Sequence, residues 1–194
     1  MKIVNNKIYI ARGETPTYSA SIIDRDTGAP LIIDKGLYTE KNGRKVNTMV
    51  LEFVVRDSAY ARGDDFRMKY TLLIEQDPSF HLFDGTAIIP YSDVSANLEE
   101  WQDSITPKEG FENYLYHRMD KHEDNFYAYY KDGHWTEYSF DFDVTFNYLE
   151  TSVLEPKTYK YEISLLGLSD ETNIVYKKPI LDLTDFIVEG SISG

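Results

Sequence analysis

The sequence lacks cysteine altogether, which excludes a disulfide framework, a thiolate metal site and a cysteine nucleophile. It also lacks any apolar stretch that approaches the length of a membrane-spanning helix. Basic residues are scarce, with 20 Lys and Arg against 33 Asp and Glu, and the formal net charge is −13 at pH 7. Nucleic acids and anionic membranes attract basic surfaces, so we expect neither as a partner. This charge fits a soluble protein, or one whose neighbours carry the compensating positive charge.

Patterns typical of a reaction centre are missing too. His117 and His122 are five residues apart, a spacing that would not place them on one face of a helix as metal ligands, and His81 and His134 stand alone. Asp141 and Asp143 alternate with apolar residues, so we interpret them as a solvated strand face and not as a glycosidase pair. There is no serine elbow and no glycine-rich phosphate loop. We predict no catalytic, cofactor-binding or metal-binding residues, and a protein that is not an enzyme.

Strict alternation of apolar and polar residues is the strongest pattern present. It occurs in two runs, and a period of two places all the apolar side chains of a strand on one face. A strand of this kind covers a core on one side only, as in an antiparallel sandwich. The apolar positions are Tyr138, Phe140, Phe142, Val144 and Phe146 in the first run, and Tyr159, Tyr161, Ile163 and Leu165 in the second.

Shorter strands with turn residues between them are predicted over most of the remaining chain. Gly28 and the Arg62-Gly63-Asp64 tripeptide are interpreted as parts of turns, and residues 34–47 as a loop. One short helix is expected over residues 95–104. We predict a single all-β domain over residues 1–194. Its further strands are expected at residues 7–10, 17–24, 50–56, 69–75, 87–89, 175–177 and 180–192.

Residues 93–137 differ from the rest and are predicted to form an aromatic-rich insertion of one or two hairpins. Asp132-Gly133 is a strong hairpin signal, because a type I′ turn needs positive φ at both central residues. Tyrosine combines a large apolar ring with a hydroxyl that tolerates water, which suits protein interfaces. The residues that we expect at an interface are Tyr114, Tyr116, Phe126, Tyr127, Tyr129, Tyr130 and Trp135.

The same aromatics permit a second interpretation. Together with Trp101 they could form a stacking platform for sugars, which would make the protein a carbohydrate-binding or adhesin module. The sequence does not separate this option from a subunit interface. Under the interface hypothesis, deletion of residues 111–136 is expected to leave the sandwich folded and to abolish assembly.

Four fragments, taken in order, resemble a known family, the N-terminal domain of phage upper baseplate proteins and related siphophage tail and fibre-attachment domains. They are residues 8–15, 22–30, 51–57 and 154–163. The last contains Tyr159-Lys160-Tyr161-Glu162-Ile163, which is similar to the family's Tyr-Xaa-Tyr-Asp/Glu-Ile strand. Lys157-Thr158 stands where that family more often has a glycine.

The resemblance implies an immunoglobulin-like antiparallel β-sandwich in a virion, where it would join a receptor-binding or fibre protein to the tail or baseplate. It implies other virion structural proteins as partners and a homo-oligomeric arrangement. It carries over no catalytic residues. The polar N-terminal residues 1–6 have no apolar signal core, so we expect synthesis and assembly in the host cytoplasm.

Overall fold

The structure, a computed structural model, describes residues 1–23, 27–41, 43–60, 65–74, 81–90, 98–119, 126–170 and 173–190. Over these residues the chain is built mostly of β-strands, and its helices are short. The prediction of an all-β protein is confirmed, whereas the immunoglobulin-like topology stays a prediction. His122 and the Arg62-Gly63-Asp64 tripeptide lie outside the described residues.

The chain divides into two compact units, where the sequence predicted one domain with an insertion at about 93–137. Unit 1 comprises residues 1–20, 40–77 and 142–194, and unit 2 comprises residues 21–39 and 78–141. Unit 2 is therefore larger than the predicted insertion and includes a segment from the first quarter of the chain. Hydrogen bonds of 3.0–3.1 Å between Phe83 and the backbone of Ile33 and Lys35 join its two segments. Such long-range pairing leaves no mark in local sequence patterns.

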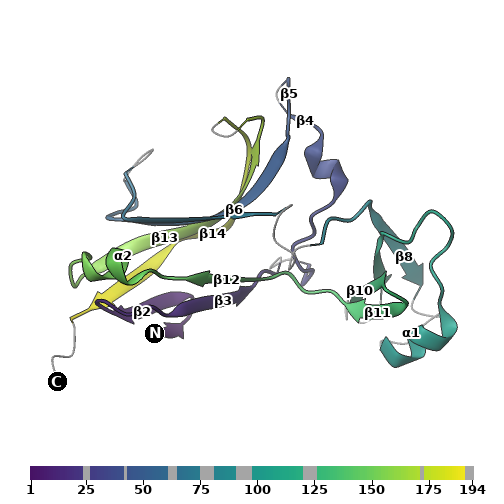
Figure 1. The fold of residues 1–194 in the computed structure, drawn as a ribbon, viewed down its shortest axis with the longest axis horizontal. Coiled ribbons are helices and arrows are strands. Elements are labelled where there is room, and N and C mark those ends of the chain that lie inside the picture. The colour runs from purple at the N-terminus through teal and green to yellow at the C-terminus, as the bar shows by residue number, and fades with distance from the viewer. Residues whose placement is uncertain are drawn as a thin grey trace. The chain divides into compact units, whose positions relative to one another are not determined.

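Unit 1 contains a six-stranded sheet, and the two-stranded sheet β3–β12 provides the second layer of the sandwich (Figure 1). Neighbouring strands of the large sheet are antiparallel except for β14 and β2, which run parallel. This sheet contains, in spatial order, β1 (Lys2–Val4), β2 (Lys7–Ala11), β14 (Ile174–Glu189), β13 (Thr158–Leu168), β6 (Thr48–Arg56) and β7 (Met68–Leu73). The smaller elements are β3 (Thr17–Ser21), β12 (Asp141–Thr145), the pair β4 (Glu40–Lys41) and β5 (Arg44–Lys45), and helix α2 (Tyr148–Ser152).

Aromatic side chains fill the core of unit 1. The ring centroid of Phe53 lies 5.1 Å from that of Tyr161 on the same sheet, and 5.6 Å from those of Tyr18 and Phe146. The predicted inward positions of the two alternating runs are all buried. Ser164, on the predicted solvent face of β13, is buried as well, so this strand is covered on both sides there and the expectation of one covered face is wrong for it.

Residues 34–47, predicted to be a loop, contain the short strands β4 and β5, and two long strands also depart from the sequence-based expectations. β6 is buried on both faces, since Val50 and Val54 are covered as well as Leu51 and Phe53. β14 is one continuous strand where two were predicted. Pro179 has no backbone N–H, but it lies where the pairing register between β14 and β13 shifts, so the strand continues through it.

Unit 2 contains a four-stranded sheet in the order β11 (His134–Glu137), β10 (Phe126–Lys131), β9 (Leu115–Met119) and β8 (Thr86–Pro90). β8 and β9 are parallel and the other pairs antiparallel. The predicted hairpin is confirmed, because β10 and β11 pair around Asp132 and Gly133, with φ of 51° and 85°. Helix α1 (Leu98–Ser104) and a 3-10 turn at Lys35–Tyr38 complete the unit.

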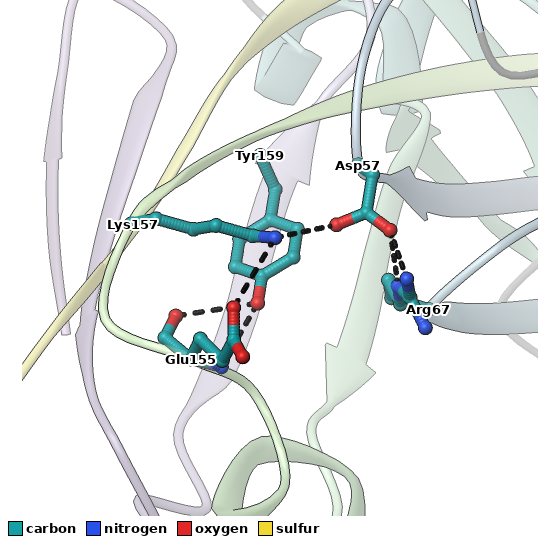
Figure 2. A network of polar contacts seen from close by, with 5 residues as sticks. All are labelled: Asp57, Arg67, Glu155, Lys157 and Tyr159. Carbon is teal, nitrogen blue, oxygen red and sulfur yellow. Dashed lines mark hydrogen bonds and ion pairs between the residues drawn. The ribbon is translucent and has the colours of Figure 1, made fainter.

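A polar network fastens three strands at one end of the large sheet (Figure 2). Asp57, which follows β6, pairs with Arg67 before β7 and, at 2.9 Å, with Lys157 before β13. The ammonium group of Lys157 also lies 4.9 Å from the ring centroid of Tyr159, whose hydroxyl contacts the backbone of Glu155. Hydrogen bonds from Arg67 and Lys157 hold the pKa of Asp57 below its usual value.

We predict that Asp57→Asn lowers the free energy of unfolding by about 1 kcal/mol at pH 7, the upper range for exposed ion pairs. Because the folded-state pKa of Asp57 is depressed, its stabilisation is present above the unfolded-state pKa of about 4 and is lost as the pH falls below it. The difference between variant and wild type should therefore shrink in acid, as measured by urea unfolding at several pH values. Asp182→Asn, at an exposed position of β14, is the control. An unchanged difference at pH 3 would contradict the assignment.

Candidate functional site

The predicted interface aromatics all lie in unit 2, but three of them are covered by the protein itself. Tyr116, Tyr127 and Trp135 are only 6%, 7% and 5% exposed. This burial leaves them little surface for a partner and corrects the interpretation of these three as contact residues. The other four, which are half-buried, are Tyr114, Phe126, Tyr129 and Tyr130.

The two tryptophans form the core of unit 2. Trp101 of α1 is fully buried, with its ring centroid 5.1 Å from that of Trp135 and 5.4 Å from that of Phe126. The indole N–H of Trp135 donates to the Ile105 carbonyl at 2.9 Å. Neither tryptophan can serve as an open stacking platform for sugars, because each ring already packs against other side chains.

The structure also changes what a deletion of residues 111–136 would test. It would remove β9, β10 and most of β11, and with them Tyr116 and Trp135 from the core of unit 2. Loss of assembly in such a variant would then report unfolding of unit 2 as much as loss of an interface. Single substitutions on exposed residues give a cleaner test.

His117 and His81 have structural surroundings. His117 stacks on Tyr127, with centroids 4.3 Å apart and ring planes 10° from parallel. His81 is 2.9 Å from the side-chain oxygen of Asn113 and packs between Phe83 and Tyr129. In the described part of the chain, no group of three or more His, Asp or Glu side chains is arranged to hold a metal ion.

Helix α2 in unit 1 is an exposed element with a rigid attachment. The Asn147 side chain caps its first turn by accepting from the Leu149 N–H at 2.8 Å. The fully buried Thr151 donates through its hydroxyl to the Glu14 carbonyl at 2.7 Å, and Arg12 donates to the Ser152 carbonyl at 2.7 Å. A five-residue helix is unstable alone, so these contacts determine its position.

The outer side of α2 and its C-cap carries three apolar side chains that are exposed to solvent. Tyr148, Leu149 and Val153 are 56%, 69% and 73% exposed. Leu149 and Val153 are four residues apart, which places them on one side of the helical turn. We call these three residues the α2 apolar face. Large apolar side chains that lie next to one another on a protein surface mark a candidate contact site.

The carboxylates beside the α2 apolar face are engaged within unit 1. Glu150 accepts a hydrogen bond from the Tyr70 hydroxyl. Glu14 accepts from the Ala11 N–H at 3.1 Å and pairs with the N-terminal amine at 3.3 Å, and these contacts lower its pKa. A docking partner would therefore meet apolar side chains flanked by carboxylates that already have hydrogen-bond donors.

Sequence reasoning missed the α2 apolar face, although a signal was present. Asn147 is a favoured N-cap residue, and Leu149 and Val153 have helical spacing after the strand pattern ends at Phe146. A single turn of helix is too short for periodicity to stand out beside the long strands.

Comparison with protein-family models, curated protein sequences and solved structures finds no match to this chain. Neither of the described α-helices is long and apolar enough to cross a bilayer.

Proposed function

We propose that this chain is a non-enzymatic structural protein of a bacteriophage virion that assembles with neighbouring subunits through the α2 apolar face. The observation that carries the assembly role is the rigid outward presentation of Tyr148, Leu149 and Val153 on a capped and anchored helix. The virion setting rests on the ordered sequence fragments that resemble phage baseplate and tail domains. A tail, baseplate or fibre-attachment position, reached after synthesis in the host cytoplasm, fits that setting.

Burial of this face in a contact would supply a useful amount of free energy. Covering the exposed parts of Leu149 and Val153 is worth about 1–2 kcal/mol each, and the Tyr148 ring adds to it. The helix is already ordered in the free protein, so little conformational entropy is lost when a partner docks. A further copy of this chain is the partner we propose, as part of a homo-oligomeric assembly.

The sheet edges offer a second contribution to the same assembly role. β1 and β7 are the outer strands of the large sheet, and β8 and β11 those of the four-stranded sheet. Exposed edges can pair with a strand from another chain. Ile88 on β8 is 65% exposed, which makes this edge the more apolar candidate of unit 2.

Leu149→Asp should weaken self-association at least about tenfold, because a charge would be buried in the contact without a partner. Sedimentation velocity over a range of protein concentrations measures the effect, and incorporation into particles in the producing phage measures its consequence. Ile174→Asp is the matched control, since Ile174 is an exposed apolar residue of β14 that does not belong to the α2 apolar face. Equal association of Leu149→Asp and wild type would contradict the proposal, as would a wild-type chain that remains monomeric at high concentration.

A further inference from the structure

Two adjoining hollows flank the segment from Glu137 to Phe140 in unit 2. One has a volume of about 230 Å³ and the other of about 220 Å³. Glu137, Tyr138 and Ser139 line both, so one short piece of chain forms the wall between them. We call this pair the twin hollows.

Backbone contacts hold that wall in place. The Tyr138 N–H donates to the Tyr127 carbonyl at 2.8 Å, and the buried Tyr138 hydroxyl donates to the Leu31 carbonyl at 2.8 Å. The Ile22 N–H donates to the Phe140 carbonyl at 2.9 Å, and the Leu31 N–H to the Ile22 carbonyl at 3.0 Å. The wall is therefore fixed from β10 and from the segment that contains Ile22 and Leu31, and the hollows are preformed.

The polar groups of the twin hollows are mainly hydrogen-bond acceptors. The hydroxyls of Ser139 and Ser21 both donate to the Asp141 carboxylate, and these bonds lower its pKa, so Asp141 is ionised at neutral pH. With their protons directed at Asp141, the two serine oxygens present lone pairs to a ligand. The Glu137 side chain is exposed, and its carboxylate adds two further acceptor oxygens.

Apolar and aromatic surfaces complete the lining. Ile22, Ile23 and Pro30 border the first hollow, and Tyr127, backed by the stacked His117 ring, lines it as well. Tyr129 and His81 line the second, with their ring centroids 4.7 Å apart. Both hollows thus combine acceptors with flat apolar surface, which suits a ligand that has hydroxyl groups on its edge and C–H groups on its faces.

We propose that the twin hollows bind two consecutive units of a neutral saccharide, one in each hollow. Sugar hydroxyls would donate to Glu137, Asp141 and the serine oxygens, and the sugar faces would lie against Ile23 and Pro30 in the first hollow and against Tyr129 in the second. No Lys or Arg is among the described residues that line either hollow, so among these residues an anionic ligand would meet carboxylates and no cationic side chain. A single ammonium or guanidinium group would occupy one hollow only, whereas two similar hollows with a common wall match a ligand with repeated units.

This inference goes beyond the proposed assembly role and does not depend on it. The α2 apolar face belongs to unit 1, and all residues lining the twin hollows belong to unit 2. Failure of Leu149→Asp to affect assembly would leave the saccharide proposal intact. Absence of saccharide binding would likewise leave the assembly proposal intact.

The full chain is applied to a glycan array, and the strongest neutral glycan is then titrated by calorimetry as a disaccharide and as its single sugars. We expect binding of the disaccharide that is at least about tenfold tighter than binding of either single sugar. Glu137→Gln and Asp141→Asn should each weaken it about tenfold or more, because each removes a charge-assisted hydrogen bond. Asp143→Asn is the matched control: Asp143 is exposed two residues further along β12 and lines neither hollow.

Three outcomes would overturn the proposal. One is an array on which no neutral glycan binds above the level of heat-denatured protein. Another is glycan binding that is unchanged in Glu137→Gln and Asp141→Asn when tryptophan fluorescence shows that unit 2 is folded in both variants. The third is displacement of amide resonances at Glu137 and Ser139 by arginine amide but by no neutral sugar, which would identify a cationic ligand instead.

Discussion

Trp101→Ala is expected to unfold unit 2 at neutral pH while the sheet of unit 1 remains formed. Trp101 is fully buried between Trp135 and Phe126, and its removal leaves a cavity that the short helix α1 cannot fill. Substitutions of this kind cost about 3–5 kcal/mol, which is comparable to the whole stability of a small domain. Gln102 would lose its position as well, since its side chain accepts from the Trp135 N–H at 3.1 Å and donates to the Gly133 carbonyl at 2.8 Å.

The chain provides its own reporter for this prediction, because its two tryptophans are both in unit 2. In Trp101→Ala the remaining emission comes from Trp135 and should shift to longer wavelength as that ring meets water. Amide hydrogen exchange in β6 and β13 reports on unit 1 in the same sample and should keep its protection. Tyr60→Ala, at a position 90% exposed, is the control for substitution of an aromatic residue. Trp135 emission that stays at the wild-type wavelength would contradict the prediction.

The part of the fold predicted from the sequence is the part specified by local side-chain alternation. The positions of Tyr159 and Tyr161 on the buried face, and the turn at Asp132 and Gly133, follow from the two-residue period and from turn chemistry. The burial of both faces of β6 was not predicted, although its residues from Met49 to Val55 are all apolar except Glu52, a pattern typical of a strand covered on both sides.

The division into two units was not predictable from local patterns. The alternating run of residues 138–146 looks uniform, yet Tyr138 and Phe140 belong to unit 2, and Phe142, Val144 and Phe146 to unit 1. One strand pattern therefore supplies two cores. Alternation shows which face of a strand is covered but not which segment covers it, so it gives no domain boundary.

The candidate sites were harder to predict for a related reason. Aromatic composition indicates that large rings are to be covered, but the covering group can belong to the same chain or to another protein. Trp135 and Tyr116 are covered by side chains of the same chain, and their own ring centroids lie 4.9 Å apart. The twin hollows depend on contacts between Ser21 and Asp141, which are 120 residues apart in the sequence.

Phe53→Ala is the substitution expected to have the largest effect on unit 1. Phe53 is buried at the centre of the aromatic core, where it contacts Tyr18, Tyr161 and Phe146 with centroid distances of 5.1–5.6 Å. Loss of its ring should cost about 3–5 kcal/mol through lost burial, lost ring contacts and the cavity left behind. Hydrogen exchange of β6 and β13 amides should rise steeply, since both strands border the cavity.

The milder Phe53→Leu should cost about 1–2 kcal/mol, because most of the buried volume is retained. Neither variant should change the emission wavelength of the tryptophans, because the rings that surround Trp101 and Trp135 all belong to unit 2. If Phe53→Ala instead shifts tryptophan emission and accelerates exchange of the unit 1 amides in one common transition, the two units unfold together. In that case the expected selectivity of Trp101→Ala for unit 2 would be wrong as well, because both substitutions would act on one cooperative structure.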